Sequence, residues 1–267
     1  MEHSFPLVVF TVLSQLAIGA FATLFIMDAY KKRISQKASF IMCGVILVIA
    51  LVAVLASLFH LGHPLNAYRA LLNIGDSWLT REIVFFPGFM LGAFIYALFA
   101  KTASSKKWIG MATVALGTIT IFCTAMIYII PAIPAWNNGT TMAAFFMTAL
   151  LVGPVLIQVM LYLLKEKTMD LSKYTMIMAA FVIVLNVLNV TILSGGIAEA
   201  AQTGALLLES PLFWIKMILL AAGLGLAGYM IINRKMKSMG MVSVLFICFF
   251  GAEFIGRILF YSTGIHL

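Results

Sequence analysis

The chain has 267 residues, of which 63% are hydrophobic and 10% are charged, and its mean hydropathy is +1.11. Soluble domains carry about 25% charged residues, so this composition excludes a soluble protein and predicts an integral membrane protein. The formal net charge is +8, but most of the basic residues lie in short connections, which argues against a nucleic-acid-binding protein.

Eight apolar stretches follow one another along the chain. Each has the length of roughly 20 residues that a helix needs to cross a hydrocarbon core of about 30 Å. A segment in lipid must satisfy its own backbone hydrogen bonds, so each stretch is expected to be helical. We therefore expect an all-α integral membrane protein with eight transmembrane helices, forming a single domain over residues 1–267 in two packed helix bundles. The expected spans are Pro6–Ala29, Ala38–Phe59, Glu82–Ala100, Trp108–Ile130, Thr140–Leu164, Tyr174–Leu193, Pro211–Ile232 and Met241–Thr263.

The basic residues alternate between the connections. Of the 17 lysines and arginines, 13 lie in or beside the first, third, fifth and seventh connections. The positive-inside rule assigns these connections to the cytoplasm, so both termini are expected on the periplasmic side of the inner membrane. The N-terminal "MEHSF" lacks the basic region of a cleavable signal peptide, and the "KKR" at 31–33 favours the same orientation.

The connection "SLFHLGHPLNAYRALLNIGDSWLTRE" at 57–82 carries unusually many ionisable residues. His60 and His63 are three residues apart, so they share a face if the helix continues that far, although Pro64 favours an end there. Glu82 is expected to begin the third span, near a helix N-terminus that stabilises negative charge. These residues indicate a candidate site at the outer water boundary.

The last span contains a second ionisable group in "GAEFIGRILFY" at 251–261. Glu253 and Arg257 are four residues apart and can pair on one helix face. An ionisable residue within a span is costly and marks a functional site by default, but this pair could also simply neutralise itself and fix helix packing. Lys216, near the outer end of the seventh span, fits a side chain that snorkels to the interface. Isolated polar residues inside spans are expected to form interhelical hydrogen bonds: Gln15, Gln158, Asn186 and Asn189.

Metal-binding patterns are weak in this sequence. The three cysteines are isolated and lie inside spans, so we expect inert thiols and neither disulfides nor a metal centre. A transmembrane haem b needs two facing histidines, and no span interior contains one. A haem held by His60 together with His3 or His266 stays open as an alternative.

Together, His60, Glu82 and Arg257 are expected to converge on one outer pocket with apolar walls, as a lipid-soluble ligand requires. A neutral histidine can take a proton from a quinol hydroxyl, and a carboxylate at the water boundary can pass it outward. Without a metal in this chain, the electrons would leave to a partner protein. A secondary transporter is the rival interpretation, but only Pro154 suggests the broken helix typical of that class.

Four stretches resemble the membrane-anchor subunit of dimethyl sulfoxide reductase, the DmsC family. They are "ASLFHLGHPLNAYRALLNIGDSWLTREI" at 56–83, "PLVVFTVLSQLAIGAF" at 6–21, "IPAW" at 133–136 and "GRILFY" at 256–261. The first stretch carries the family's H-L-G-x-P pattern and a closing triplet similar to N-E-I. The resemblance covers nearly the whole chain, in the same order and with the same topology.

The resemblance implies a role that the chain performs only as a subunit. It implies a menaquinol-oxidising anchor in anaerobic respiration, which passes electrons to a [4Fe–4S] iron–sulfur subunit and a molybdopterin catalytic subunit on the periplasmic face. It further implies that His60 and Glu82 bind the quinol, and that this chain holds no haem.

Four further residues are candidates for the quinol pocket. His63 stands where the family pattern has a small residue such as serine, so it is either a second proton acceptor or an interfacial substitution, with the second favoured. Arg257 matches a family motif, but its role in the pocket is inferred from position, as are those of Arg81 and Glu253. Quinol protons are expected to leave on the same side as the electrons.

Overall fold

The computed structural model describes residues 5–31, 34–58, 75–98, 103–166, 170–233 and 238–265. Within these ranges all regular structure is helical, and eight of the nine helices are long and apolar enough to cross a membrane. The predicted all-α membrane fold with eight spans is thereby confirmed. The helices are α1 (Phe5–Lys31), α2 (Gln36–Leu58), α3 (Trp78–Leu98), α4 (Ala103–Tyr128), α5 (Gly139–Leu163), α6 (Ser172–Ser194), α7 (Ala198–Glu209), α8 (Pro211–Ile232) and α9 (Met239–Thr263).

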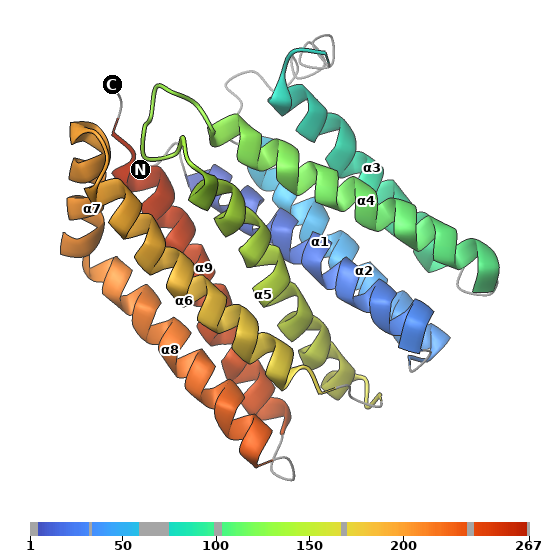
Figure 1. Cartoon of the computed structure of the whole chain (residues 1–267). Coiled ribbons are helices and arrows are strands. Elements are labelled where there is room, and N and C mark those ends of the chain that lie inside the picture. Colours follow the sequence, from blue (N-terminus) through green and yellow to red (C-terminus); the bar gives the residue numbers. More distant parts are fainter. Residues whose placement is uncertain are drawn as a thin grey trace.

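The long helices form two bundles that lie side by side (Figure 1). One buried apolar cluster joins α1, α2, α3 and α4 with one side of α5. A second cluster joins α5, α6, α8 and α9, and α1 contributes Leu16 to it. Helices α1 and α5 therefore form the junction between the bundles, as the prediction of two packed bundles requires.

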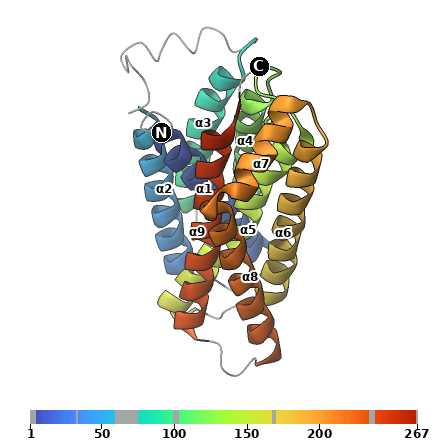
Figure 2. The same cartoon turned by 90° about the vertical axis from the view of Figure 1, so that its left-hand side faces the viewer.

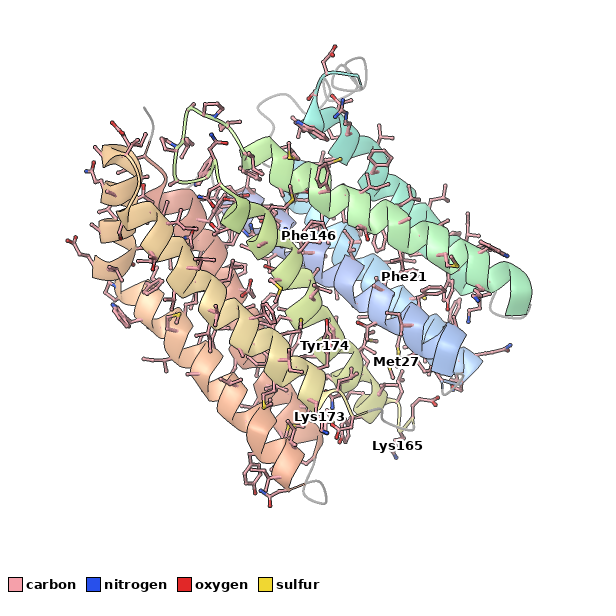
Figure 3. The ribbon with its side chains drawn as sticks, viewed as in Figure 1. Phe21, Met27, Phe146, Lys165, Lys173 and Tyr174 are labelled. Carbon is pink, nitrogen blue, oxygen red and sulfur yellow. The ribbon has the colours of Figure 1, made fainter. Side chains whose placement is uncertain are left out.

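The chain begins and ends at the same end of the molecule, where α7 also lies (Figures 1 and 2). We call this the terminal end. The helix ends that flank the basic connections lie at the opposite end, which we call the basic end, and Figure 3 shows Lys165 and Lys173 there. The charge asymmetry of the sequence is thus also an asymmetry between the two ends of the fold.

Two differences from the expected spans bear on the candidate site. Residues 194–211 were expected to be a connection, but they contain α7, which has only 12 residues and is too short to cross a membrane. Helix α3 begins at Trp78 because the Ser77 hydroxyl accepts the backbone N–H of Thr80 at 3.3 Å and caps the first turn. Glu82 consequently lies one turn inside α3 and does not begin it.

Helices α1 and α5 approach each other closely at two glycines. A Cβ atom on Gly19 would lie 2.0 Å from the carbonyl oxygen of Ala149, and one on Gly153 would lie 2.3 Å from the carbonyl carbon of Gly19. Both obstacles are backbone atoms, which cannot rotate away. Small residues allow this kind of close backbone packing between membrane helices, so these glycines hold the two bundles together.

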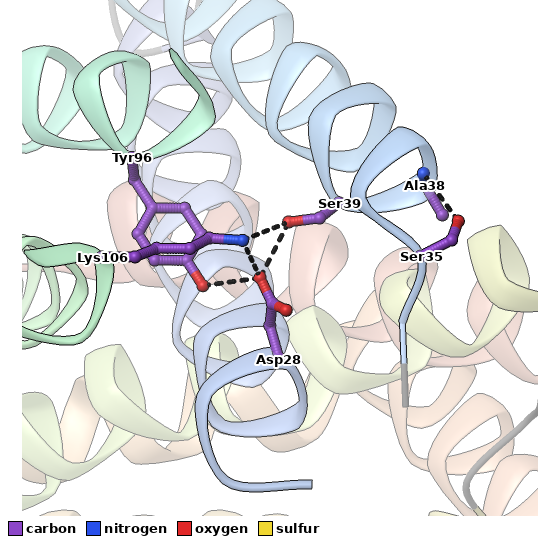
Figure 4. A network of polar contacts seen from close by, with 6 residues as sticks. All are labelled: Asp28, Ser35, Ala38, Ser39, Tyr96 and Lys106. Atoms are coloured by element: carbon purple, nitrogen blue, oxygen red, sulfur yellow. Dashed lines mark hydrogen bonds and ion pairs between the residues drawn. The ribbon is translucent and has the colours of Figure 1, made fainter. Parts of the chain in front are cut away.

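A polar network ties four helices together at the basic end (Figure 4). The carboxylate of Asp28 in α1 accepts hydrogen bonds from Ser39 of α2 at 3.0 Å and from Tyr96 of α3 at 2.8 Å. It also forms an ion pair with Lys106 of α4, whose ammonium lies 4.7 Å from the centre of the Tyr96 ring. All three bonds go to one oxygen, Oδ2. The network therefore fixes α1, α2, α3 and α4, the helices of the N-terminal bundle, to one another.

We expect Asp28→Asn to lower the free energy of unfolding by about 3 kcal/mol, because Lys106 then keeps a largely buried charge without its counterion. Replacing both residues, as Asp28→Asn with Lys106→Met, should recover most of the loss, since a buried ion pair contributes little net stability over apolar side chains. Thermal unfolding of the purified protein in detergent measures both effects. A double variant no more stable than Asp28→Asn alone would contradict this account of the network.

Candidate functional site

Glu82 is a buried carboxylate on α3, and its side chain is only 5% exposed. Its Oε1 accepts a hydrogen bond from the hydroxyl of Thr124 on α4, which also lies 2.9 Å from the carbonyl oxygen of Thr120. Its other oxygen, Oε2, receives no hydrogen bond from the residues that the structure describes. Glu82 thus has one oxygen held in place and one available to another donor.

Two tyrosines lie close to Glu82. The hydroxyl of Tyr261 on α9 donates to that of Tyr128 on α4 at 2.7 Å, and both groups lie within electrostatic range of the Glu82 carboxylate. The Tyr128 ring makes edge or tilted contacts with Trp136, with Phe145 and with two rings of α9. The result is a paired set of hydroxyls inside an aromatic cluster, next to a carboxylate.

Arg257 lies on the other side of this aromatic cluster, and its side chain is only 4% exposed. Its Nη2 donates to Gln15 of α1 at 2.8 Å and lies 3.4 Å from the hydroxyl of Thr148. The centre of the guanidinium is 3.6 Å from the centre of the Phe145 ring, in cation–π geometry. Arg257 therefore links α9 to α1 and α5, where the two bundles meet.

The expected direct pairing of Glu253 with Arg257 does not occur. Within the part of the chain that the structure describes, no ion pair joins them. The hydroxyl of Thr148 stands between the two, donating to Glu253 Oε2 at 2.6 Å while it can accept from Arg257. The other Glu253 oxygen, Oε1, is buried and has no partner. Spacing along α9 allows a direct pair, but Arg257 is drawn away by partners on α1 and α5.

A cavity of about 100 Å³ lies in the C-terminal bundle, and Glu253 and Arg257 line it. Lys216 of α8 lines it too, and its ammonium donates to the side-chain oxygen of Asn186 on α6 at 2.6 Å. Lys216 therefore reaches across to a neighbouring helix, whereas snorkelling to the interface was expected. Glu82 is not part of this cavity, which is lined by residues of α5, α6, α7, α8, α9 and the connection before α5.

Three of the four stretches that carry the family resemblance meet in space. Gln15, from the stretch at 6–21, binds Arg257 of the "GRILFY" stretch. Trp136, from "IPAW", donates its indole N–H to the carbonyl oxygen of Phe260 at 2.9 Å, and the two rings stack with centroids 4.9 Å apart. Segments far apart in the sequence thus build one cluster around α9.

Comparisons with known proteins point to the same family along the whole chain. The family described as "DMSO reductase anchor subunit (DmsC)" matches residues 1–263. The chain belongs to this DmsC family. The YnfH subunit of an anaerobic dimethyl sulfoxide reductase of Escherichia coli is 32% identical over 99% of this chain and 95% of its own length. The C subunit of the Haemophilus influenzae enzyme is 28% identical, and the C subunit of the Escherichia coli enzyme 27%, each over 99% of this chain and at least 95% of the relative.

The site residues predicted for this DmsC-family anchor fall into three groups. Glu82 and Arg257 are both buried and form no direct contact, but both lie within electrostatic range of the hydroxyls of Tyr128 and Tyr261. Arg81 lies at the start of α3, with its guanidinium 4.2 Å from the centre of the Trp78 ring and a hydrogen bond to the carbonyl oxygen of Gly75. His60 and His63 lie outside the described residues, as do His3 and His266.

Several side chains that complete the site of this DmsC-family chain were not predicted from its sequence. Thr124, Thr148 and Tyr128 carry no motif, because hydroxyl side chains are common inside membrane helices and their partners come from other helices. Tyr261 could have been found, because it closes the "GRILFY" stretch. Within the described ranges, no group of three or more histidine, cysteine, aspartate or glutamate side chains is placed to hold a metal ion.

We expect Thr148→Val in this DmsC-family anchor to lower stability by about 1–3 kcal/mol, because both oxygens of the buried Glu253 would then lack a donor. Valine has nearly the same shape, so the packing of α5 is kept. Thr118→Val is the matched control, since Thr118 is exposed and bonds only to the carbonyl oxygen of Val114 in its own helix. Unfolding curves of both variants in detergent compare the effects. Equal losses would show that Thr148 does not support Glu253.

Proposed function

We propose that this DmsC-family anchor oxidises a quinol of the menaquinol class at the terminal end of α3 and passes the electrons to an iron–sulfur subunit. The observation that carries the proposal is the Glu82 carboxylate, which is buried within electrostatic range of two tyrosine hydroxyls and has one oxygen free of any described donor. A site of this kind suits a lipid-soluble ring with hydroxyl groups, because it offers apolar walls and few polar groups.

The chemistry requires two proton acceptors and one electron acceptor. A quinol that becomes a quinone releases two protons and two electrons. Glu82 Oε2 takes one proton, while Thr124 fixes Oε1 and so keeps the carboxylate in a single orientation. His60 takes the other proton, as the family resemblance implies. The electrons leave to the partner subunit.

The partners follow from the family and from the charge asymmetry. Three curated relatives are subunits of anaerobic dimethyl sulfoxide reductases, which supports association with an iron–sulfur subunit and a molybdopterin catalytic subunit. The basic end favours the cytoplasm by the positive-inside rule. The terminal end, with Glu82 and the connections that frame it, would then face the periplasm of the inner membrane and dock the partners there.

The proposal predicts that quinol protons appear outside the cytoplasm. In sealed right-side-out vesicles that contain the complete complex, quinol oxidation with external ferricyanide as the electron acceptor, which takes up no protons, should acidify the external medium. A pH-sensitive dye that cannot cross the membrane measures this. Acidification of the vesicle lumen would contradict the placement of the site at the terminal end.

Binding of a fluorescent quinol-site inhibitor tests the site directly. Membranes that contain the assembled complex should bind it, and His60→Ala should lower its affinity at least about tenfold, which corresponds to about 1.4 kcal/mol. Western blotting of the partner subunits in the same membranes reports assembly. Unchanged inhibitor binding and turnover in assembled His60→Ala complexes would remove His60 from the proposal.

A further inference from the structure

The cavity between α5, α6, α7, α8 and α9 is lined by charged side chains that the proposed quinol oxidation at Glu82 does not use. It extends from the terminal end, where Thr263 and residues of α7 line it, down to Glu253 and Lys216. Glu253 precedes the end of α9 at Thr263 by ten residues, or about 15 Å, and Lys216 follows the start of α8 at Pro211 by five residues, or about 7 Å. A ligand that reaches both Glu253 and Lys216 therefore extends from the terminal end into the depth of the hydrocarbon core.

The polar groups of this cavity are incompletely satisfied. Glu253 is 7% exposed, and its Oε1 is a buried acceptor without a donor. The ammonium of Lys216 has three N–H groups, and its hydrogen bond to Asn186 uses one of them. A buried carboxylate oxygen without a donor is costly, so a ligand that supplies one gains binding energy.

The arrangement of charge excludes most kinds of ligand. An anion would be attracted by Lys216 and Arg257 but repelled by Glu253, and an amine would meet the opposite conflict. A zwitterionic lipid headgroup could satisfy both signs, but a headgroup held at the membrane surface does not reach Glu253, about 15 Å below the end of α9. A neutral molecule that donates one hydrogen bond and accepts another meets every requirement.

We propose that this cavity is a second binding site of the chain, which takes the ring of a neutral quinol. One ring hydroxyl donates to Glu253 Oε1, and the oxygen on the other side of the ring accepts from Lys216. The cavity walls include Trp136, Phe213 and Phe260, which suit an aromatic ring. This proposal does not depend on quinol oxidation at Glu82, because the two sites share no titratable side chain.

The cavity has to widen to hold a quinol ring. It measures about 100 Å³, whereas a cavity of roughly 150 Å³ accepts benzene, and the flexible side chain of Met147 in its wall can move to make this room. Gly256 makes room for Lys216, because a Cβ atom there would lie 2.6 Å from the ammonium nitrogen. The glycine of "GRILFY" thus lets Lys216 extend over α9 towards the cavity.

Photolabelling separates the two sites. Membranes with the complete complex are illuminated with an azido-naphthoquinone, and the labelled peptides are identified by mass spectrometry, with and without excess unlabelled menadione. We expect adducts on peptides of α6 and α8 around Asn186 and Lys216 that the competitor removes. Absence of such adducts, or adducts that menadione does not displace, would overturn the second site.

Two variants probe the cavity by different means. Lys216→Met removes the donor, and Ala144→Leu fills part of the space, since Ala144 lines the cavity. Each should reduce labelling of α6 and α8 at least about tenfold while labelling of peptides near Glu82 persists. Ala115→Leu, on the exposed face of α4, is the control for the larger side chain. Unchanged labelling of α6 and α8 in a folded Ala144→Leu protein would overturn the proposal even if Lys216→Met fails to fold.

The labelling pattern also distinguishes the two proposals. Adducts near Glu82 alone would leave the proposed quinol oxidation standing and overturn the second site. Adducts in the cavity alone would support the second site and remove Glu82 from quinol binding. A tightly held phospholipid found by mass spectrometry of the purified protein, and lost in Lys216→Met, would identify a lipid headgroup in place of a quinol and overturn the assignment.

Discussion

Glu82→Gln should abolish quinol oxidation by the assembled complex, with a fall in turnover of about 10²- to 10⁴-fold. Glutamine keeps the size of the side chain and can still accept the hydrogen bond from Thr124 through its amide oxygen. It cannot take up a proton at the second position, where the carboxylate has a free oxygen. The expected loss is the usual contribution of a positioned general base. Turnover is measured with a reduced quinol analogue and dimethyl sulfoxide in membranes.

The control for this substitution is Glu209→Gln, which makes the same chemical change at an exposed position at the end of α7. It should leave turnover within about twofold of the unaltered complex. Both variants must be compared at equal amounts of membrane-bound partner subunits, because loss of assembly would imitate loss of catalysis. Normal turnover of an assembled Glu82→Gln complex would show that Glu82 has a structural role, and proton uptake would then have to occur elsewhere.

The sequence predicted the membrane spans well because their signal is local. A run of about 20 apolar residues is enough to define a helix in lipid, whatever its neighbours are. The helix α7 was missed because it has only 12 residues and follows two glycines, so it lacks both the length and the continuous apolar character of a span. The start of α3 was displaced because one hydroxyl, that of Ser77, caps the helix before its apolar part begins.

The site was only partly predictable because its contacts join distant segments. The burial of Glu82 and Arg257 agrees with the expectation that intramembrane charges face the protein interior. Which partner each would find was not predictable from spacing. Glu253 and Arg257 stand four residues apart, yet Thr148, more than 100 positions away in sequence, lies between them. The sequence therefore predicted that these residues matter to the fold, but not how they are arranged.

Residues from two of the stretches that resemble the DmsC family lie at the junction between the bundles. Gln15 on α1, Phe145 and Thr148 on α5 and Arg257 on α9 form one contact group there. The Glu82 site lies on the N-terminal side of this group, and the cavity with Lys216 lies on the C-terminal side. Any change in the separation of α1 and α5 would consequently disturb both sites at once. A substitution that forces these two helices apart therefore tests whether the two sites are arranged around this junction.

Gly153→Leu should therefore prevent correct folding or lower stability by about 3 kcal/mol or more. Overpacking in a well-packed core usually costs about 1–3 kcal/mol because side chains rotate or shift to make room. Here a Cβ atom alone would lie 2.3 Å from backbone carbon and 2.4 Å from backbone nitrogen of α1, and backbone cannot rotate away. The two bundles would have to separate. Fluorescence-detected gel filtration of a tagged protein after heating measures the remaining folded fraction.

Gly225→Leu is the matched control, because a Cβ atom on Gly225 meets nothing within 4 Å and the residue is exposed in the middle of α8. Leucine favours helix over glycine by up to about 1 kcal/mol, so this variant should be as stable as the unaltered protein or slightly more so. The two substitutions are identical in chemistry and both lie inside membrane helices. If Gly153→Leu also folded normally, α1 and α5 would not be in backbone contact, and the junction that separates the Glu82 site from the Lys216 cavity would have a different geometry.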